Sequence, residues 1–231
     1  MGYQLKKTVV LVGMMGSGKT AVGSALARIL DVPFLDSDTE IVAAANMSIA
    51  EIFERDGEPF FRDKETQVIT RLLETERGIL STGGGAFLAE KNREVIHDKG
   101  AAVWLRAETD LLWSHVRHKN TRPLLRTDNP YATLKDLCDA RNPVYALADL
   151  AVDARAEYSI EDMAGRVIEA LLTRPDLLEV AWKPFVWNLV RGPMMCVSGH
   201  RFCLMPPPRS RLCWRARKWQ LLLIRLWRDC I

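Results

Sequence analysis

Short apolar runs and longer stretches with helical spacing alternate along the first 174 residues of the chain. Runs bounded by glycine, proline or aspartate are typical of buried strands, whereas apolar residues three and four apart indicate amphipathic helices. We predict five strands, at residues 8–12, 33–35, 78–82, 101–105 and 150–152. We predict helices at residues 20–30, 59–75, 89–99, 109–118, 131–146 and 159–172.

This alternation predicts right-handed βαβ connections, and therefore a three-layer α/β/α fold around a five-stranded parallel sheet. In open parallel sheets, ligands bind at the carboxyl ends of the strands. Gly13, Asp36 and Gly83 all lie at predicted strand ends. We therefore expect these three turns to meet at one edge of the sheet.

The turn after the first predicted strand fits the phosphate-loop pattern G-x-x-x-x-G-K-[ST]. Its glycines let backbone N–H groups point at phosphate oxygens, and the following helix adds its positive N-terminus. In such loops the lysine bridges the β- and γ-phosphates, and the final hydroxyl ligates Mg²⁺. A glycine-rich turn that matches by chance is the alternative. The predicted ATP-binding residues of this loop are Gly13, Met14, Met15, Gly16, Ser17, Gly18, Lys19 and Thr20.

Two carboxylates, Asp36 and Asp38, follow the second predicted strand. One can enter the Mg²⁺ shell, directly or through water, and the other can orient an acceptor hydroxyl and take its proton. The alternative is that Ser37 or Asp38 only caps the helix that follows. The sequence by itself leaves both interpretations open.

These segments and several later ones together resemble the shikimate kinase family. The motifs are GMMGSGKT, F-x-D-x-D, F-R with a glutamate three residues on, a triple glycine, R-P-L-L and R-x-P-x-Y. They occupy residues 13–20, 34–38, 61–65, 83–85, 122–125 and 141–145. The resemblance covers about residues 5–173. It implies a P-loop kinase fold of the nucleoside monophosphate kinase type, with ATP and Mg²⁺, and shikimate as acceptor on the chorismate route to aromatic amino acids.

The resemblance also implies roles for individual side chains. Asp38 matches the group that orients and deprotonates the shikimate 3-hydroxyl, and Asp36 matches a second metal-side group beside Thr20. Arg62 and Arg141 match the pair that binds the shikimate carboxylate. A guanidinium presents paired donors that fit a carboxylate, which agrees with this assignment. Without the family pattern, either arginine could be a solvated charge on a helix face.

Gly83, Gly84 and Gly85 end the third predicted strand, where many P-loop proteins carry an acidic residue. Three glycines permit close backbone approach, so their N–H groups are predicted to reach the acceptor and the γ-phosphate. A flexible strand-to-helix turn is the alternative. Glu65 is expected to position Arg62 through an ion pair, although a plain surface glutamate fits the sequence almost as well.

Residues 115–129 are polar and basic and contain a proline, which is typical of a mobile lid that closes over phosphates. Arg122 is the predicted third catalytic residue, after Lys19 and Asp38, and should reach the transferring phosphoryl group. We expect no catalytic role for His115, which we place on the solvated surface.

Two further arginines are predicted near the nucleotide base. Arg117 is expected to pack on the adenine, in a lid whose length varies within the family. Arg155 follows the fifth predicted strand, where the adenine loop of the family would lie, and we expect backbone contacts with the base there.

Composition changes near residue 175. Residues 1–174 contain 22 basic and 26 acidic residues, whereas residues 175–231 contain 10 and 3, with four of the five cysteines. We predict a kinase domain at 1–174 and an extension at 175–231 outside the family resemblance. The extension could be disordered or loosely packed, could form a basic amphipathic helix at 211–227, or could bind a metal. The residues of this last interpretation are Cys196, His200, Cys203 and Cys213.

Transfer of phosphate to the shikimate 3-hydroxyl is the leading functional hypothesis. A kinase for another small metabolite, such as gluconate, and a P-loop module that binds nucleotide without transferring phosphate are the alternatives. The basic extension alone suggests nucleic-acid binding, and we expect none. No window is apolar enough to span a bilayer, so we expect no membrane contact for residues 1–174, a cytoplasmic location and a monomer.

Overall fold

The computed structural model describes residues 2–117 and 127–181. A five-stranded parallel sheet in the order β3-β4-β2-β5-β6 forms its centre. The strands are β2 (Thr8–Val12), β3 (Phe34–Asp36), β4 (Ile79–Ser81), β5 (Gly100–Ala107) and β6 (Leu150–Ala154). The predicted three-layer fold is confirmed, and each of these strands begins and ends within two residues of its expected position.

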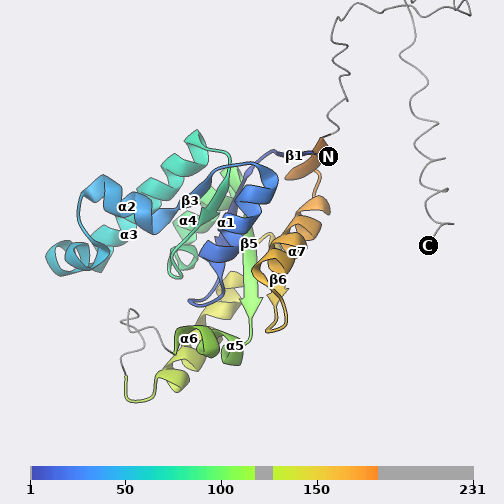
Figure 1. Ribbon diagram of the computed structural model, residues 1–231. Coiled ribbons are helices and arrows are strands. Elements are labelled where there is room, and N and C mark those ends of the chain that lie inside the picture. The colour runs from blue at the N-terminus through green and yellow to red at the C-terminus, as the bar shows by residue number, and fades with distance from the viewer. Residues whose placement is uncertain (1, 118–126, 182–231) are drawn as a thin grey trace, which may run out of the picture. The chain divides into compact units, whose positions relative to one another are not determined.

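Helices cover both faces of this sheet (Figure 1). They are α1 (Lys19–Leu30), α2 (Ser37–Ala45), α3 (Ile49–Thr75), α4 (Glu90–Lys99), α5 (Thr109–Val116), α6 (Pro130–Tyr145) and α7 (Ile160–Leu172). Alternate residues of a strand point to opposite faces. Val9 and Leu11 of β2 accordingly join one core with α1 and α7, whereas Val10 and Val12 join a second core with α3 and α4.

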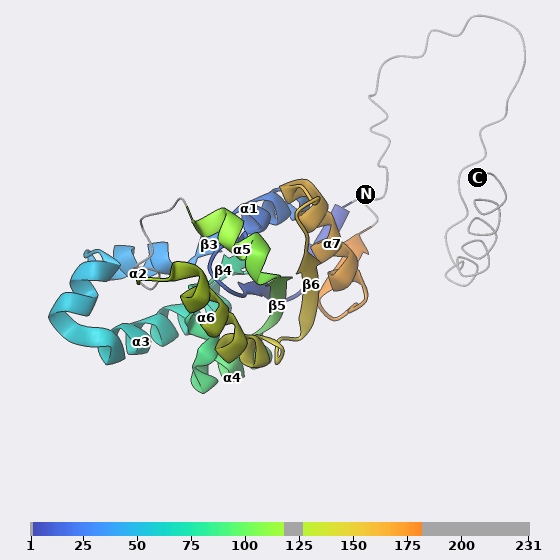
Figure 2. The same cartoon turned by 90° about the horizontal axis from the view of Figure 1, so that it is seen from below.

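The carboxyl ends of the strands define one edge of the molecule. In Figure 1, β5 runs toward the bottom of the view, where α5 and α6 lie. Figure 2 looks at this edge from below, with α2 and the first half of α3 projecting to one side. The edge therefore lies among α5, α6 and the helices that follow β3.

A second, smaller sheet was missed by sequence reasoning. β1 (Gly2–Leu5) pairs antiparallel with β7 (Leu178–Ala181), and both Leu177 and Leu178 are buried. Residues 175–181 therefore belong to the domain, and the boundary predicted at residue 174 is too early. Four-residue strands carry little periodic signal, and these two become a sheet only through a pairing across the whole domain.

Helix α3 also begins earlier than the predicted start at residue 59. A capping box between Ser48 and Glu51 starts it, and a break at Gly57 (φ 82°, ψ 172°) divides it into two segments before Pro59. Glycine adopts this conformation without a Cβ penalty. In the described part of the chain, no helix combines the length and apolarity needed to cross a membrane.

Candidate active site

The turns after β2, β3 and β4 meet at the carboxyl edge of the sheet. A Cβ atom built on Gly84 would lie 3.7 Å from the Gly13 carbonyl oxygen and 3.8 Å from the Met15 nitrogen. A Cβ atom on Gly83 would lie 3.1 Å from Oδ1 of Asp38. The triple glycine therefore lies between the phosphate loop and the acidic turn, and a side chain at Gly83 would crowd Asp38.

The phosphate loop is anchored by burial and by contact with α5. Met14 and Met15 are buried, and Gly16 adopts a φ of 85°. A Cβ atom on Gly16 would lie 2.8 Å from Cγ1 of Val116 and 3.1 Å from the carbonyl oxygen of Leu112. This position therefore requires glycine both for its backbone conformation and for the closeness of the helix.

Two polar side chains of the loop indicate where phosphate would bind. Nζ of Lys19 donates hydrogen bonds to the carbonyl oxygens of Gly13 (2.8 Å) and Met14 (2.9 Å), so its ammonium lies over the loop. Oγ of Ser17 is buried without a hydrogen-bond partner among the described residues. Because buried polar atoms are normally satisfied, a phosphate oxygen in the loop would supply a natural partner.

Asp36 is the cap of α2, which neither sequence interpretation had expected. Its Oδ1 accepts hydrogen bonds from the backbone nitrogens of Asp38 (3.1 Å) and Thr39 (3.3 Å). Ser37 and Asp38 are therefore not the cap. Ser37 is fully buried, and its Oγ accepts a hydrogen bond of 3.4 Å from the backbone N–H of Gly83. This contact ties the acidic turn to the triple glycine.

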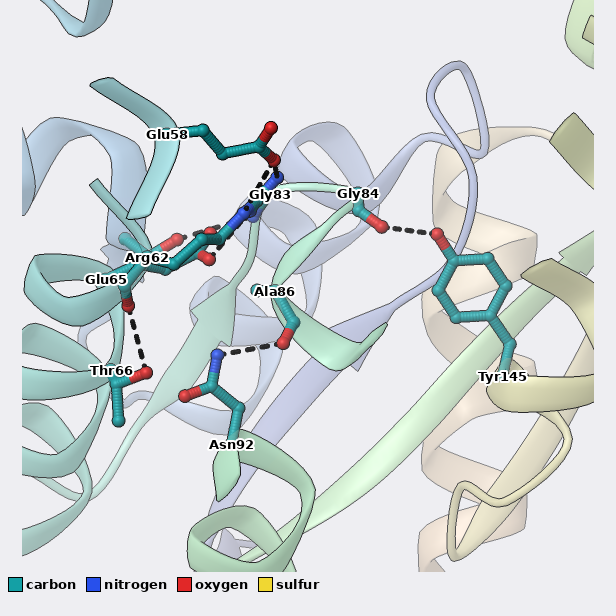
Figure 3. Close-up of polar contacts among 10 residues, drawn as sticks. Glu58, Arg62, Glu65, Thr66, Gly83, Gly84, Ala86, Asn92 and Tyr145 are labelled. Atoms are coloured by element: carbon teal, nitrogen blue, oxygen red, sulfur yellow. Dashed lines mark hydrogen bonds and ion pairs between the residues drawn. The ribbon is translucent and has the colours of Figure 1, made fainter. Parts of the chain in front are cut away.

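Arg62 lies beside the last glycine of the triple-glycine turn and is held by two glutamates (Figure 3). Its NH1 donates to Oε2 of Glu65 at 2.8 Å, and its NH2 and Nε donate to Oε1 of Glu58 at 3.1 and 3.3 Å. Burial lowers the pKa of Arg62, but the two ion pairs outweigh it, so the pKa lies above its ordinary value. The predicted pair between Arg62 and Glu65 is present.

Glu65 is itself buried, with 2% of its side chain exposed. Burial raises the pKa of this carboxyl, more than the hydrogen bond and charge of Arg62 lower it, and the charge of Asp38 raises it further. Oε1 of Glu65 would lie 3.4 Å from a Cβ atom on Gly83. The carboxyl groups of Asp38 and Glu65 thus flank one glycine, and Arg62 pairs with one of them.

Arg141 lies on α6, one turn before Tyr145. The Tyr145 hydroxyl donates a hydrogen bond to the carbonyl oxygen of Gly84 (Figure 3). Burial raises the pKa of Tyr145, and Arg141 opposes this shift through its charge and a hydrogen bond. Arg141 therefore lies next to the Tyr145 side chain, whose hydroxyl contacts the triple glycine.

The remaining predicted residues are less completely placed. Arg122 lies outside the described residues. Arg117 is exposed directly after α5, and residues 115–116 belong to that helix rather than to a lid. Arg155 follows β6, where its described partners are Glu157, at 3.7 Å, and the ring of Tyr158. The structure does not bring Arg155 into contact with the phosphate loop.

Sequence reasoning missed two residues that contact the catalytic turns. Nδ1 of His115 lies 2.8 Å from the carbonyl oxygen of Gly16, although the residue is exposed, as expected. The amide nitrogen of buried Asn92 donates to the carbonyl oxygen of Ala86 at 2.8 Å, directly after the triple glycine (Figure 3). A histidine near the end of a helix and an asparagine within one carry no local signal of such contacts.

A phosphate loop at the first strand end, an acidic turn at the second and a triple glycine between them, with Arg62 beside it, define a P-loop phosphotransferase of the small-molecule type. The family model for shikimate kinase matches residues 15–172. The chain belongs to the shikimate kinase family.

Individual relatives and solved structures agree with this membership. The chain is 67% identical to the shikimate kinase of Cereibacter sphaeroides over 76% of its length and 88% of the relative. It is 64% identical to that of Ruegeria pomeroyi over 77% of its length and 91% of the relative. The solved shikimate kinase from Acinetobacter baumannii in complex with shikimate superposes with a TM-score of 0.68 at 36% identity, covering 72% of this chain and 93% of that one.

Proposed function

We propose that this chain transfers the γ-phosphate of ATP to the 3-hydroxyl of shikimate, giving shikimate 3-phosphate and ADP. The observation that carries the proposal is the position of Arg62, whose guanidinium lies beside Gly85. Arg141 supports it, because it lies next to Tyr145, whose hydroxyl contacts Gly84. Asp38 lies against Gly83, and the neighbouring Gly84 lies against the phosphate loop. Family membership supports the same acceptor.

Different residues of the chain have different roles in this reaction. Lys19 and the loop N–H groups hold the phosphates and stabilise the charge that develops on the transferring group. Asp38 holds the acceptor hydroxyl and receives its proton late in transfer. Arg62 and Arg141 bind the acceptor carboxylate, which fixes the hydroxyl in line with the phosphate. Arg122, outside the described residues, is assigned to the transferring phosphoryl group.

Mg²⁺ is proposed to accompany ATP, held by Thr20 and Asp36. Oδ1 of Asp36 is engaged by backbone N–H groups, while its Oδ2 has no partner among the described residues. Within residues 2–117 and 127–181, no cluster of three or more His, Cys, Asp or Glu could hold a metal alone. This fits Mg²⁺, which takes one or two protein oxygens together with phosphates and water. The ion would neutralise charge on the β- and γ-phosphates.

The proposal is tested by ADP release from the full chain with shikimate or gluconate as acceptor. We expect turnover with shikimate alone. Arg62→Ala should raise the KM for shikimate by roughly a hundredfold, because a charged pair to the acceptor is lost. Arg71→Ala is the matched control, since Arg71 lies on the same helix and pairs with Glu40 at 2.8 Å. Turnover with gluconate only, or ATP binding without acceptor-dependent turnover, would contradict the proposal.

The oligomeric state, the location and the adenine contacts of the enzyme are also proposals. We propose a monomer in the cytoplasm, where ATP is available, with Arg117 and Arg155 near the adenine. The extension was predicted at 175–231; the part of it from 182 to 231, on which the alternatives given above depend, lies outside the described residues, and they stay predictions.

A further inference from the structure

Arg62 reaches the site with its donors already engaged by protein carboxylates. Glu65 accepts a hydrogen bond from NH1, whereas a single oxygen of Glu58 accepts from both NH2 and Nε. The Nε–NH2 edge of a guanidinium carries two parallel N–H donors, which is the geometry that binds a carboxylate in bidentate fashion. Glu58 therefore occupies the edge that suits an acceptor carboxylate best.

The other paired edge of Arg62 is closed by the triple-glycine turn. A Cβ atom on Gly85 would lie 2.7 Å from both NH1 and NH2 and 3.0 Å from Cζ. Equal distances to the two terminal nitrogens, with the central carbon farther away, mean that this end of the guanidinium points at Gly85. A carboxylate cannot enter there without displacing the glycine backbone. Only the edge held by Glu58 remains for bidentate binding.

We propose that Glu58 is a specificity-determining residue that competes with the acceptor carboxylate for the Nε–NH2 edge of Arg62. The inference rests on the proposed function, because it takes Arg62 as the acceptor's partner. An acceptor gains this edge only by displacing Glu58. Neutral acceptors, which cannot replace the displaced charge, are therefore disfavoured.

The two glutamates differ in how easily they can leave Arg62. The Glu65 side chain is 2% exposed, so its departure would leave a buried charge unpaired. The Glu58 side chain is 64% exposed, and Arg62 itself is 35% exposed. An exposed pair four residues apart on a helix is weak, and water can solvate Glu58 when it turns away. Glu65 thus keeps Arg62 in place while Glu58 exchanges with the acceptor.

The helix break at Gly57 affects how Glu58 can leave Arg62. Glu58 directly follows Gly57, whose φ of 82° breaks helix α3. Glu58 therefore starts the second helical segment, where no preceding helical turn packs against its side chain. Rotation of the side chain alone is enough to release Arg62, and α3 need not move.

The test compares the steady-state KM for shikimate between the full-length wild type and Glu58→Gln. Removing the competing charge should lower the KM by roughly two- to fivefold, as for the loss of a weak exposed ion pair, with the KM for ATP unchanged. Glu58→Asp keeps the charge but is one methylene shorter, so it should lower the KM as well. Glu54→Gln is the matched control, because Glu54 is an exposed glutamate in the first segment of α3, before the break at Gly57.

Each outcome separates the possible explanations. An unchanged or higher KM in Glu58→Gln would overturn the inference, since Glu58 would then support Arg62 rather than compete with the acceptor. An equal fall in Glu54→Gln would also overturn it, by showing a general charge effect. If the wild type shows no shikimate-dependent turnover, the proposed function fails instead, and this result is distinct from both.

Discussion

The phosphate loop and the acceptor side of the site are held in place by different kinds of interaction. The loop depends on packing: Met14 and Met15 are buried, and α5 contacts Gly16. The acceptor side depends on charge, with Arg62 held between Glu58 and Glu65. Packed cores resist small displacements, whereas exposed ion pairs exchange readily. Changes at the packed positions of the loop should therefore affect stability, and changes on the acceptor side should affect acceptor affinity.

The largest effect is expected at Lys19. Lys19→Ala removes the ammonium that lies over the Gly13 and Met14 carbonyls, and with it a preorganised charge for the transferring phosphoryl group. We expect kcat to fall by roughly a thousandfold, as measured by coupled ADP release. The thermal unfolding midpoint should stay close to that of the wild type. Turnover within tenfold of the wild type would show that Lys19 is not part of the reaction.

Asp38 should give the next largest effect and separates chemistry from nucleotide binding. Asp38→Asn keeps the size of the side chain that faces Gly83 but cannot accept the proton. We expect turnover to fall by roughly a hundredfold while the affinity for ATP, measured by calorimetry, changes little. Equal losses in ATP affinity and turnover would contradict the assigned role and place Asp38 with the nucleotide instead.

Gly85 and Gly16 offer a direct contrast between the two sides. In Gly85→Ala the new Cβ would lie 2.7 Å from Arg62 nitrogens, which belong to a flexible side chain. We expect the KM for shikimate to rise by about tenfold, with normal stability and a normal KM for ATP. Gly16→Ala combines positive φ with contacts to Val116 and the Leu112 backbone. It should lower the free energy of unfolding by about 1–3 kcal/mol.

Chemical denaturation and steady-state kinetics on both variants would test this contrast. If Gly85→Ala lost stability and Gly16→Ala lost only acceptor affinity, the assignment of packing to one side and charge to the other would be reversed.

The same contrast explains how much the sequence alone could predict. The phosphate loop is local: eight consecutive residues between a strand and a helix determine its form, so its position followed from the pattern. The five parallel strands were also found, because each is a short apolar run with clear boundaries. Sheet topology then brought Gly13, Asp36 and Gly83 together.

The acceptor side could be predicted only in part, because its contacts join distant segments. Arg62 and Glu65 lie three residues apart on a helix, so their ion pair was within reach of sequence reasoning. The contact between His115 and Gly16 spans 99 residues, and that between Tyr145 and Gly84 spans 61. No local pattern reports such pairings, and the cap at Asp36 was missed because β3 runs into α2 without a loop.

The smallest expected effect concerns the titration of Glu65. Burial raises the pKa of this carboxyl above its unfolded value, despite the hydrogen bond and charge of Arg62. The folded chain therefore holds this proton more tightly than the unfolded chain. The corresponding stability is present at acid pH and is lost as the pH rises through the raised pKa. The Glu65→Gln variant has no ionisable group at this position, so it does not lose this stability as the pH rises.

The stability of Glu65→Gln relative to the wild type should therefore increase as the pH rises through this range. The change amounts to about 1.4 kcal/mol for each unit by which folding shifts the pKa, and denaturation at several pH values would measure it.

The KM for shikimate should depend on the same titration. In the wild type, acidification protonates Glu65 at a higher pH than an exposed glutamate, Arg62 loses its buried charged partner, and the KM for shikimate rises by a few fold. Glu65→Gln should show no such inflection, and a persistent one would mean that another group, rather than Glu65, controls Arg62.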